Sequence, residues 1–125
     1  MTPDAVIAAS KGAAKMLPKD QQRSNETLKM TTKVQAGYSD GPLKVEVMFS
    51  FDTANQLAAV GYETRDPTQS EALKNWVIKK YGAPTHTDPK LQRTQMYSWT
   101  TPDEILLITT DDEGASVIQF KDRPW

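Results

Sequence analysis

The chain has 125 residues, of which 38% are hydrophobic and 25% are charged, and its 15 basic and 16 acidic residues give a net charge of −1. This composition is typical of one globular domain and excludes a disordered chain. The balanced charge gives no reason to expect nucleic acid as a partner, no apolar run is long enough to span a membrane, and the lack of cysteine excludes disulfides and thiolate nucleophiles.

The first residues predict a short helix that ends or bends at Gly12. Thr2 is suited to cap it and Pro3 to occupy its first position. Because Met1 leads directly into this helix with no signal peptide, two locations stay open. The protein is either cytoplasmic, or periplasmic or secreted if an export signal has been removed. Residues 16–27 are polar and predict an exposed loop.

The next segments predict three strands, because apolar residues alternate with polar ones. The predicted strands are residues 28–38, 43–51 and 57–64. The segment between the first two is Ser-Asp-Gly-Pro, which is typical of a tight turn. Residues 52–56 predict a second turn.

The clearest single element is an amphipathic helix over residues 68–81. Thr68 and Glu71 have the spacing of a capping box, in which each side chain accepts a hydrogen bond from a free backbone N–H. Gly82 and Pro84 predict the end of the helix. Its apolar face consists of Leu73, Trp76, Val77 and Tyr81.

Three more strands are predicted after this helix, at residues 93–100, 104–110 and 115–121. The second contains the continuous apolar run of residues 105–108, which is typical of a strand covered on both faces. Residues 122–125 predict a tail, since a proline there cannot extend a sheet.

These elements predict a single α+β domain, residues 1–125, with an antiparallel sheet of about six strands packed against two helices. The order α-βββ-α-βββ indicates an internal repeat with units 1–65 and 66–125. Whether the repeat is a true duplication stays open, because the matching stretches are short.

The helix ends and the strands that follow them resemble small bacterial envelope domains. The residues that carry the resemblance are Val6, Ile7 and Gly12 in the first unit, and Tyr81, Gly82, Pro84 and Trp99 in the second. The families are the SmpA/OmlA (BamE-like) lipoproteins and the tandem-repeat β-lactamase inhibitory proteins. This chain lacks the lipobox cysteine of the lipoproteins. The resemblance implies an exported module that binds another protein.

The sequence predicts no catalytic residue, no metal site and no cofactor. His86 is the only histidine and lies in a polar segment, where we expect it to be solvated. Residues 111–113 are all acidic, but a glycine follows them directly, so a tight turn explains them better than a Ca²⁺ site. Two carboxylate pairs that could meet across strand ends, as in glycosidases, are Asp52 with Asp103 and Glu104 with Asp111.

The surface of the sheet that faces away from the helices is the candidate binding surface. Met48 and Met96 are out of phase with the core of their strands and could anchor an apolar partner, or be ordinary surface methionines. The residues predicted for this surface are Met48, Met96, Lys29, Lys33, Lys44 and Glu46.

The leading hypothesis is a non-catalytic binding or assembly module of the bacterial envelope with a protein partner. The alternative is a carrier of a small apolar ligand, with a pocket between helix and sheet lined by Trp76, Phe49, Phe51 and Trp99. A small hydrolase is the third hypothesis.

Overall fold

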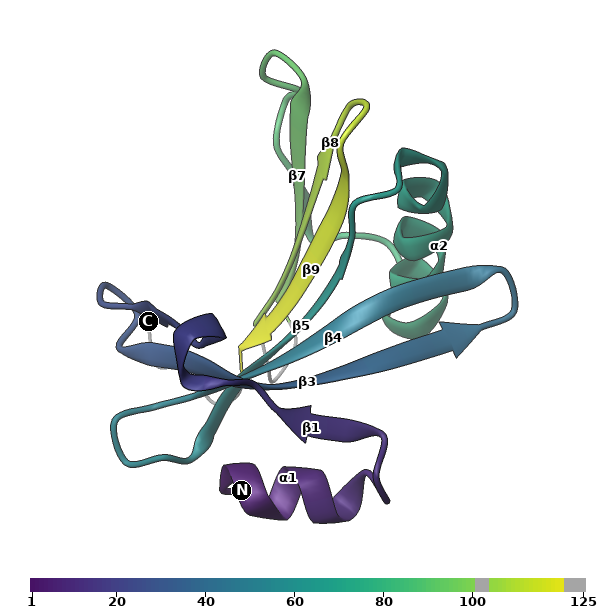
Figure 1. Ribbon diagram of the computed structural model, residues 1–125. Helices are drawn as coiled ribbons and strands as arrows, with labels where there is room; N and C mark the ends of the chain where they lie inside the picture. The colour runs from purple at the N-terminus through teal and green to yellow at the C-terminus, as the bar shows by residue number, and fades with distance from the viewer. Residues whose placement is uncertain (101–103, 121–125) are drawn as a thin grey trace.

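The computed structural model describes residues 1–100 and 104–120. In these residues, nine strands form one antiparallel sheet with the order β1-β3-β4-β5-β9-β8-β7-β6, and β2 also pairs with β3 (Figure 1). The helices are α1 (Pro3–Ala9) and α2 (Ser70–Tyr81), with two short 3₁₀ helices, η1 (Lys19–Gln21) and η2 (Pro67–Gln69). The strands are β1 (Ala14–Met16), β2 (Arg23–Asn25), β3 (Met30–Asp40), β4 (Leu43–Phe51), β5 (Leu57–Thr64), β6 (His86–Thr87), β7 (Thr94–Thr100), β8 (Glu104–Thr110) and β9 (Gly114–Phe120).

The predicted fold class, an α+β domain with about six strands and the order α-βββ-α-βββ, is wrong. The chain is mostly sheet, with nine strands and two short α-helices in its described residues. The missed strands are β1, β2 and β6, which have only two or three residues each. β2 and β6 lie in segments predicted as polar loops, and β1 lies between the predicted helix and the loop that begins at residue 16. Such short segments show no alternation, and they become strands only by pairing with the edges of β3 and β7.

Two three-strand meanders, β3-β4-β5 and β7-β8-β9, make up most of the sheet. They are joined by the antiparallel pairing of β5 with β9, which runs from Ala59 opposite Phe120 to Thr64 opposite Ala115. The sheet twists strongly between the meanders (Figure 1). Each meander falls within one of the predicted repeat units, and the duplication itself stays a prediction.

One face of the sheet carries the main core. Its largest cluster lies under α2, where Leu73 and Val77 of the helix are fully buried. The sheet residues of this cluster are Leu43, Val45, Tyr97, Trp99, Ile105, Leu107, Ala115 and Val117. A second cluster lies under α1 and contains Val6, Ala14, Val34 and Phe51. Burial of each large side chain stabilises the fold by about 1.5–3 kcal/mol.

The start of α2 differs from the prediction, whereas its end at Tyr81 is confirmed. The expected capping box of Thr68 and Glu71 does not form, because Pro67 starts a 3₁₀ turn before the helix. Asp66 caps this turn: its Oδ1 accepts hydrogen bonds from the Thr68 N–H at 2.9 Å and from the Thr68 hydroxyl at 2.6 Å. Gly82 ends the helix with φ of 84°.

Two predicted segments, the turn at residues 101–103 and the tail at residues 122–125, lie outside the described residues. Of the helices that the structure describes, none is long and apolar enough to cross a membrane.

Gly114→Ala should destabilise the protein more than any other glycine-to-alanine change. Gly114 has φ of 123°, and a Cβ placed on it would lie 2.1 Å from the Thr64 carbonyl oxygen, which is backbone and cannot move aside cheaply. We expect a loss of about 1–2 kcal/mol from the backbone conformation and roughly 1–3 kcal/mol more from the clash. Gly82→Ala is the matched control, since it has positive φ but no atom within 4 Å of the new Cβ. Urea unfolding measures both, and equal losses would contradict the close approach of the β8–β9 turn to β5.

The Asp66 cap predicts a pH dependence. The hydrogen bonds from Thr68 lower the pKa of the Asp66 carboxyl below its ordinary value of 3.8. A group with a lowered folded-state pKa stabilises the fold above its unfolded pKa, and this contribution is lost as the pH falls through the folded-state value. The difference in melting temperature between wild type and Asp66→Ala should therefore be full near pH 6 and shrink below about pH 4. A difference that is independent of pH would contradict the role of the charged carboxylate.

Candidate functional site: the open face of the sheet

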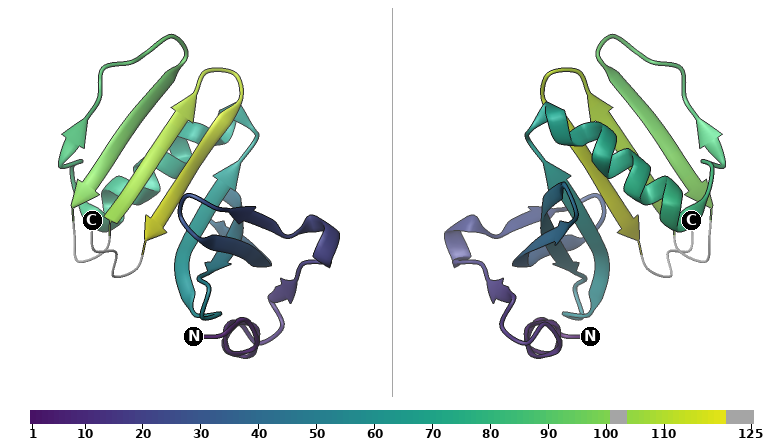
Figure 2. Two further views of the ribbon diagram at one scale, coloured as in Figure 1. Left: turned by 90° about the vertical axis from the view of Figure 1, so that its left-hand side faces the viewer. Right: turned by 90° about the vertical axis from the view of Figure 1, so that its right-hand side faces the viewer.

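The face of the sheet opposite α2 is uncovered over much of its area. In the left panel of Figure 2, α2 lies behind the strands β7, β8 and β9, and in the right panel it lies in front of them. No described element lies over the other side of these three strands near the β8–β9 turn. We call this surface the open face and define it by Glu46, Met48, Gly61, Glu63, Met96, Ser98, Leu106, Ile108, Ser116 and Ile118.

The residues of the open face form two rows that run across the strands, each made of residues paired on neighbouring strands. In the first row, Met48 pairs with Gly61, Gly61 with Ile118, and Ile118 with Leu106. Leu106 then pairs with Ser98 on β7. Gly61 contributes no side chain to this row, which is otherwise apolar as far as Leu106.

The second row changes from apolar to acidic across the sheet. Met96 pairs with Ile108, and Ile108 with Ser116. Ser116 pairs with Glu63, and Glu63 with Glu46. The row therefore places two apolar side chains over the second meander and two carboxylates over the first.

The open face is closed off at one end by the turn between β2 and β3. Met30 is buried in a small third cluster with Ala59 and Phe120, and Leu28 packs against this cluster. Leu106 and Ile118 also contact it, so they are half-covered. The part of the open face farther from this turn, with Met96 and Ile108, has no such cover.

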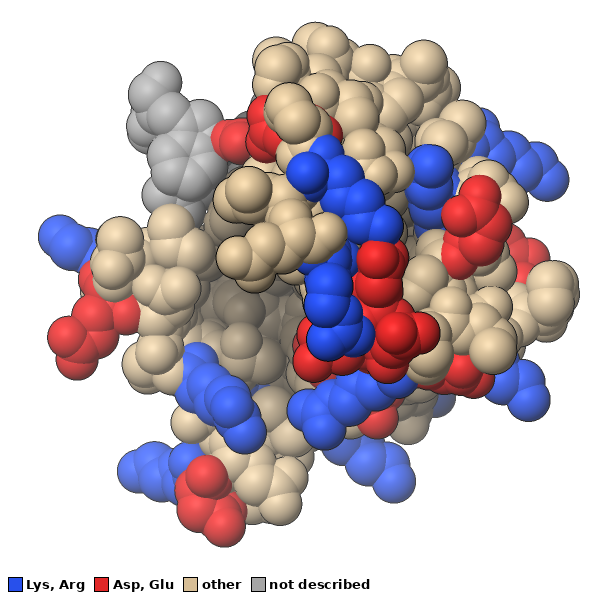
Figure 3. All heavy atoms as spheres, turned by 90° about the horizontal axis from the view of Figure 1, so that it is seen from above, with Lys and Arg blue, Asp and Glu red and all other residues tan. Residues whose placement is uncertain are grey.

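A groove of about 430 Å³ adjoins the open face between the η1–β2 segment and strands β4 and β5. Met48 lines it together with Leu17 of the facing segment. Its charged lining residues are Asp20, Arg23, Glu46, Glu63 and Arg65. Seen from above, the surface is hollowed beside closely mixed positive and negative side chains (Figure 3).

The carboxylates of Glu46 and Glu63 lie side by side on this surface, in the groove that Arg23 and Arg65 also line. They are directly opposite in the register of β4 and β5, on the same face. Neither forms an ion pair with any side chain of the described residues. Like charges opposite each other on neighbouring strands destabilise a sheet. A positively charged group of a partner would relieve this repulsion.

The predicted binding residues are only partly brought together. Glu46, Met48 and Met96 lie on the open face, and Lys44 lies beside it, opposite Ser39. Lys29 and Lys33 lie elsewhere. Lys29 has φ of 54° in the β2–β3 turn, and Lys33 sits at a bulge of β3, where its ammonium donates a hydrogen bond to Asn55 at 2.8 Å.

The sequence prediction missed Leu106, Ile108 and Ile118 as members of the surface. The apolar run 105–108 predicts a strand covered on both faces, but α2 covers only Ile105 and Leu107. The number of predicted helices could have indicated that Leu106 and Ile108 lie on an uncovered face. A domain with a single long helix cannot cover both faces of a wide sheet.

His86 makes one side-chain contact, a 2.7 Å interaction between its Nε2 and the Asp88 carboxylate. Both side chains are exposed, by 67% and 47% respectively. Ser98 lies opposite His86 in the register of β6 and β7, but no hydrogen bond joins their side chains. The three residues therefore lack the nucleophile–base contact and the enclosure that covalent catalysis needs.

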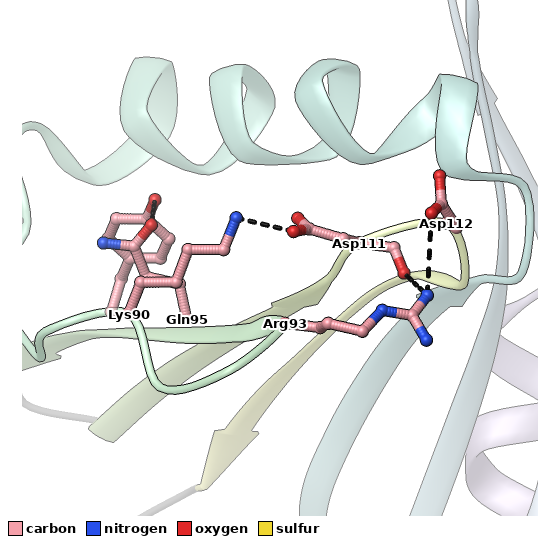
Figure 4. A network of polar contacts seen from close by, with 6 residues as sticks. Lys90, Arg93, Gln95, Asp111 and Asp112 are labelled. Carbon is pink, nitrogen blue, oxygen red and sulfur yellow. Dashed lines mark hydrogen bonds and ion pairs between the residues drawn. The ribbon is translucent and has the colours of Figure 1, made fainter.

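The acidic turn at residues 111–113 is held by basic side chains from the segment before β7 (Figure 4). The Lys90 ammonium lies 2.6 Å from the Asp111 carboxylate. Arg93 donates to the Asp111 carbonyl oxygen and lies 3.7 Å from the Asp112 carboxylate. These contacts join the β8–β9 turn to the start of β7. No group of three metal-binding side chains occurs in the described residues.

Of the two carboxylate pairs considered from the sequence, only Glu104 with Asp111 lies wholly within the described residues. Glu104 is the first residue of the seven-residue strand β8 and Asp111 follows its last, so the two do not meet. Asp103 lies outside the described residues. Asp52 accepts hydrogen bonds from the N–H groups of Ala54 and Gln56, both at 2.9 Å, and so shapes the β4–β5 turn.

The four aromatic residues predicted to line a carrier pocket divide between two clusters. Trp76 and Trp99 belong to the cluster under α2, and Phe49 and Phe51 to the cluster under α1. They therefore do not line one common pocket. Trp99 is fully buried, and its indole N–H donates to the Gly82 carbonyl oxygen at 2.9 Å.

Comparison of the chain with protein-family models, with curated proteins and with solved structures found no match. No relative therefore supplies a function for this surface. The open face and its groove are the features on which a functional proposal rests.

Glu63→Gln should stabilise the protein, because it removes the repulsion from Glu46. We expect a gain of up to about 1 kcal/mol at low ionic strength, and a smaller gain in high salt, where the repulsion is screened. Glu26→Gln, in the exposed β2–β3 turn, makes the same chemical change away from the pair and is the control. Thermal unfolding at two salt concentrations measures both. A loss of stability in Glu63→Gln would mean that its carboxylate has a favourable partner.

Proposed function

We propose that the protein is a non-catalytic binding or assembly module of the bacterial envelope, and that a partner protein docks on the open face. The observation that carries this proposal is the row of Met96 and Ile108, which leaves apolar side chains without a covering element. Apolar surface of this kind, edged by polar side chains, is typical of protein interaction sites.

The pattern of the open face defines the partner's complementary surface. Apolar side chains of the partner would cover Met96 and Ile108. A lysine or arginine of the partner would lie against Glu46 and Glu63 and neutralise their repulsion. The groove beside Met48 would hold polar residues of the partner that adjoin its apolar side chains.

The assignment to the envelope is supported by the resemblance to the SmpA/OmlA (BamE-like) and β-lactamase inhibitory protein groups. That resemblance depends on the two helix ends and on Trp99. An envelope partner is therefore the first to test, and a periplasmic location is the expectation that goes with it.

Photo-crosslinking tests this function. A photoreactive residue is placed at position 108, on the open face, or at position 79, on the exposed side of α2. In a bacterial envelope extract, position 108 should give a discrete crosslinked protein and position 79 should not. The crosslinked protein is then purified, and its affinity is measured for wild type, Ile108→Asp and the control Lys79→Asp.

Ile108→Asp should weaken binding by about tenfold or more, because it buries a carboxylate in an apolar contact next to Glu63. Lys79→Asp should bind like wild type. Crosslinks that are equal from both positions, or an Ile108→Asp variant with wild-type affinity, would contradict docking on the open face.

A further inference from the structure

The outer edge of β3 is free along its second half. β2 pairs with β3 from Met30 to Thr32, and β1 pairs with it from Val34 to Ala36. Residues 37–40 have no strand on that side in the described part of the chain, and all four are exposed. Their inner neighbours on β4 include Leu43 and Val45, which are buried under α2.

The direction of the free backbone groups follows from the register. The Leu17 N–H donates to the Lys33 carbonyl oxygen at 2.8 Å, so Lys33 directs its backbone groups toward β1. Alternate residues of a strand direct these groups to the same side. Ser39 therefore directs its N–H and its carbonyl outward, beyond the end of β1. An unpaired edge of this kind is a template for an added strand.

Aromatic side chains lie beside this edge on the side of α2. The Tyr38 ring, 38% exposed, meets the Trp76 ring edge-on with centroids 5.9 Å apart. Trp76 in turn contacts Tyr62 at 5.1 Å, and burial raises the pKa of the Tyr62 phenol above its ordinary value of 10.0. Tryptophan and tyrosine are the residues most enriched at the energetic centres of interfaces.

Three lysines and two carboxylates of the described residues lie around the edge, a small excess of positive charge. The Lys80 ammonium lies 5.1 Å from the centre of the Trp76 ring. Lys44 is opposite Ser39 on β4, and Lys15 is on β1 opposite Gln35. The nearby carboxylates are Asp40 at the end of β3 and Glu46 opposite Gly37. An acidic ligand matches this distribution better than a basic one.

We propose that residues 37–40 bind an extended acidic peptide segment of a partner, which adds to the sheet as a strand beside β3. Its backbone pairs with Ser39, one side chain packs on Tyr38 and Trp76, and a carboxylate reaches Lys80. Nothing in this segment blocks the pairing, since the bulge of β3 lies at residues 32–34 and the nearest proline, Pro42, lies in the turn. This site is distinct from the open face and goes beyond the function proposed for it.

A selection from a library of random linear peptides, carried out on the immobilised protein, tests the proposal. The enriched peptides should be acidic and should carry an apolar or aromatic residue. Each is synthesised in two forms, with one or the other set of alternate backbone amides methylated. Affinities are measured by fluorescence polarisation for wild type, Ser39→Pro, Lys80→Glu, the matched control Lys79→Glu, and Ile108→Asp on the open face.

Strand addition predicts that one set of methylated amides weakens binding about tenfold or more and that the other set has little effect. Ser39→Pro and Lys80→Glu should also weaken binding, because they remove an outward N–H and the cation. Lys79→Glu and Ile108→Asp should bind like wild type. If Ser39→Pro does not fold, which thermal unfolding shows, the methylated peptides decide.

The proposal is overturned if no peptide is enriched, if the two methylated forms bind equally, or if binding is lost in Ile108→Asp rather than in Lys80→Glu. The last outcome would place the peptides on the open face and would leave the proposed function intact. Conversely, failure of the crosslink at position 108 would not affect the binding of a peptide at β3.

Discussion

The pairing of β5 with β9 is the contact on which the rest of the structure depends. It is the only strand pair in the described sheet that joins the first meander to the second. Because of it, α2 packs at once on Leu43 and Val45 of β4 and on Trp99 and Leu107 of the second meander. Gly114 fits this junction, since its missing side chain lets the β8–β9 turn approach the Thr64 backbone.

The same pairing has a consequence for the surface. It extends the sheet beyond the width that a twelve-residue helix covers, so much of one face and part of the outer edge stay accessible. The open face combines apolar side chains with a carboxylate pair, and the edge of β3 combines free backbone groups with an aromatic surface. Both arrangements suit recognition of another chain more than they suit catalysis, which would need enclosure and an activated nucleophile.

The sequence predicts the long elements well and the short ones poorly. The six long strands and α2 lie close to the predicted positions, because each carries an apolar pattern that reflects burial. β1, β2 and β6 carry no such pattern, and their pairing depends on partners distant in the chain. The cap by Asp66 was missed because Thr68 has the same hydrogen-bonding chemistry, and only the position of Pro67 distinguishes them.

The surface was predictable only in part for a similar reason. Met48 and Met96 stand out from the sequence because they are out of phase with their strands. Ile108 does not stand out, since a continuous apolar run has no phase, and its partial exposure depends on the absence of a second helix layer over this face. The free edge of β3 depends on where β1 and β2 stop, which no local pattern of β3 indicates.

The most direct test of this account compares Ile105 and Ile108, two isoleucines of β8 on opposite faces of the sheet. Their methyl signals are recorded by NMR with a soluble paramagnetic gadolinium chelate, which broadens the signals of solvent-accessible groups. The account predicts strong broadening of the Ile108 methyl groups and almost none for Ile105. Equal protection of both would show that a further element covers the open face, and would contradict its role as a binding surface.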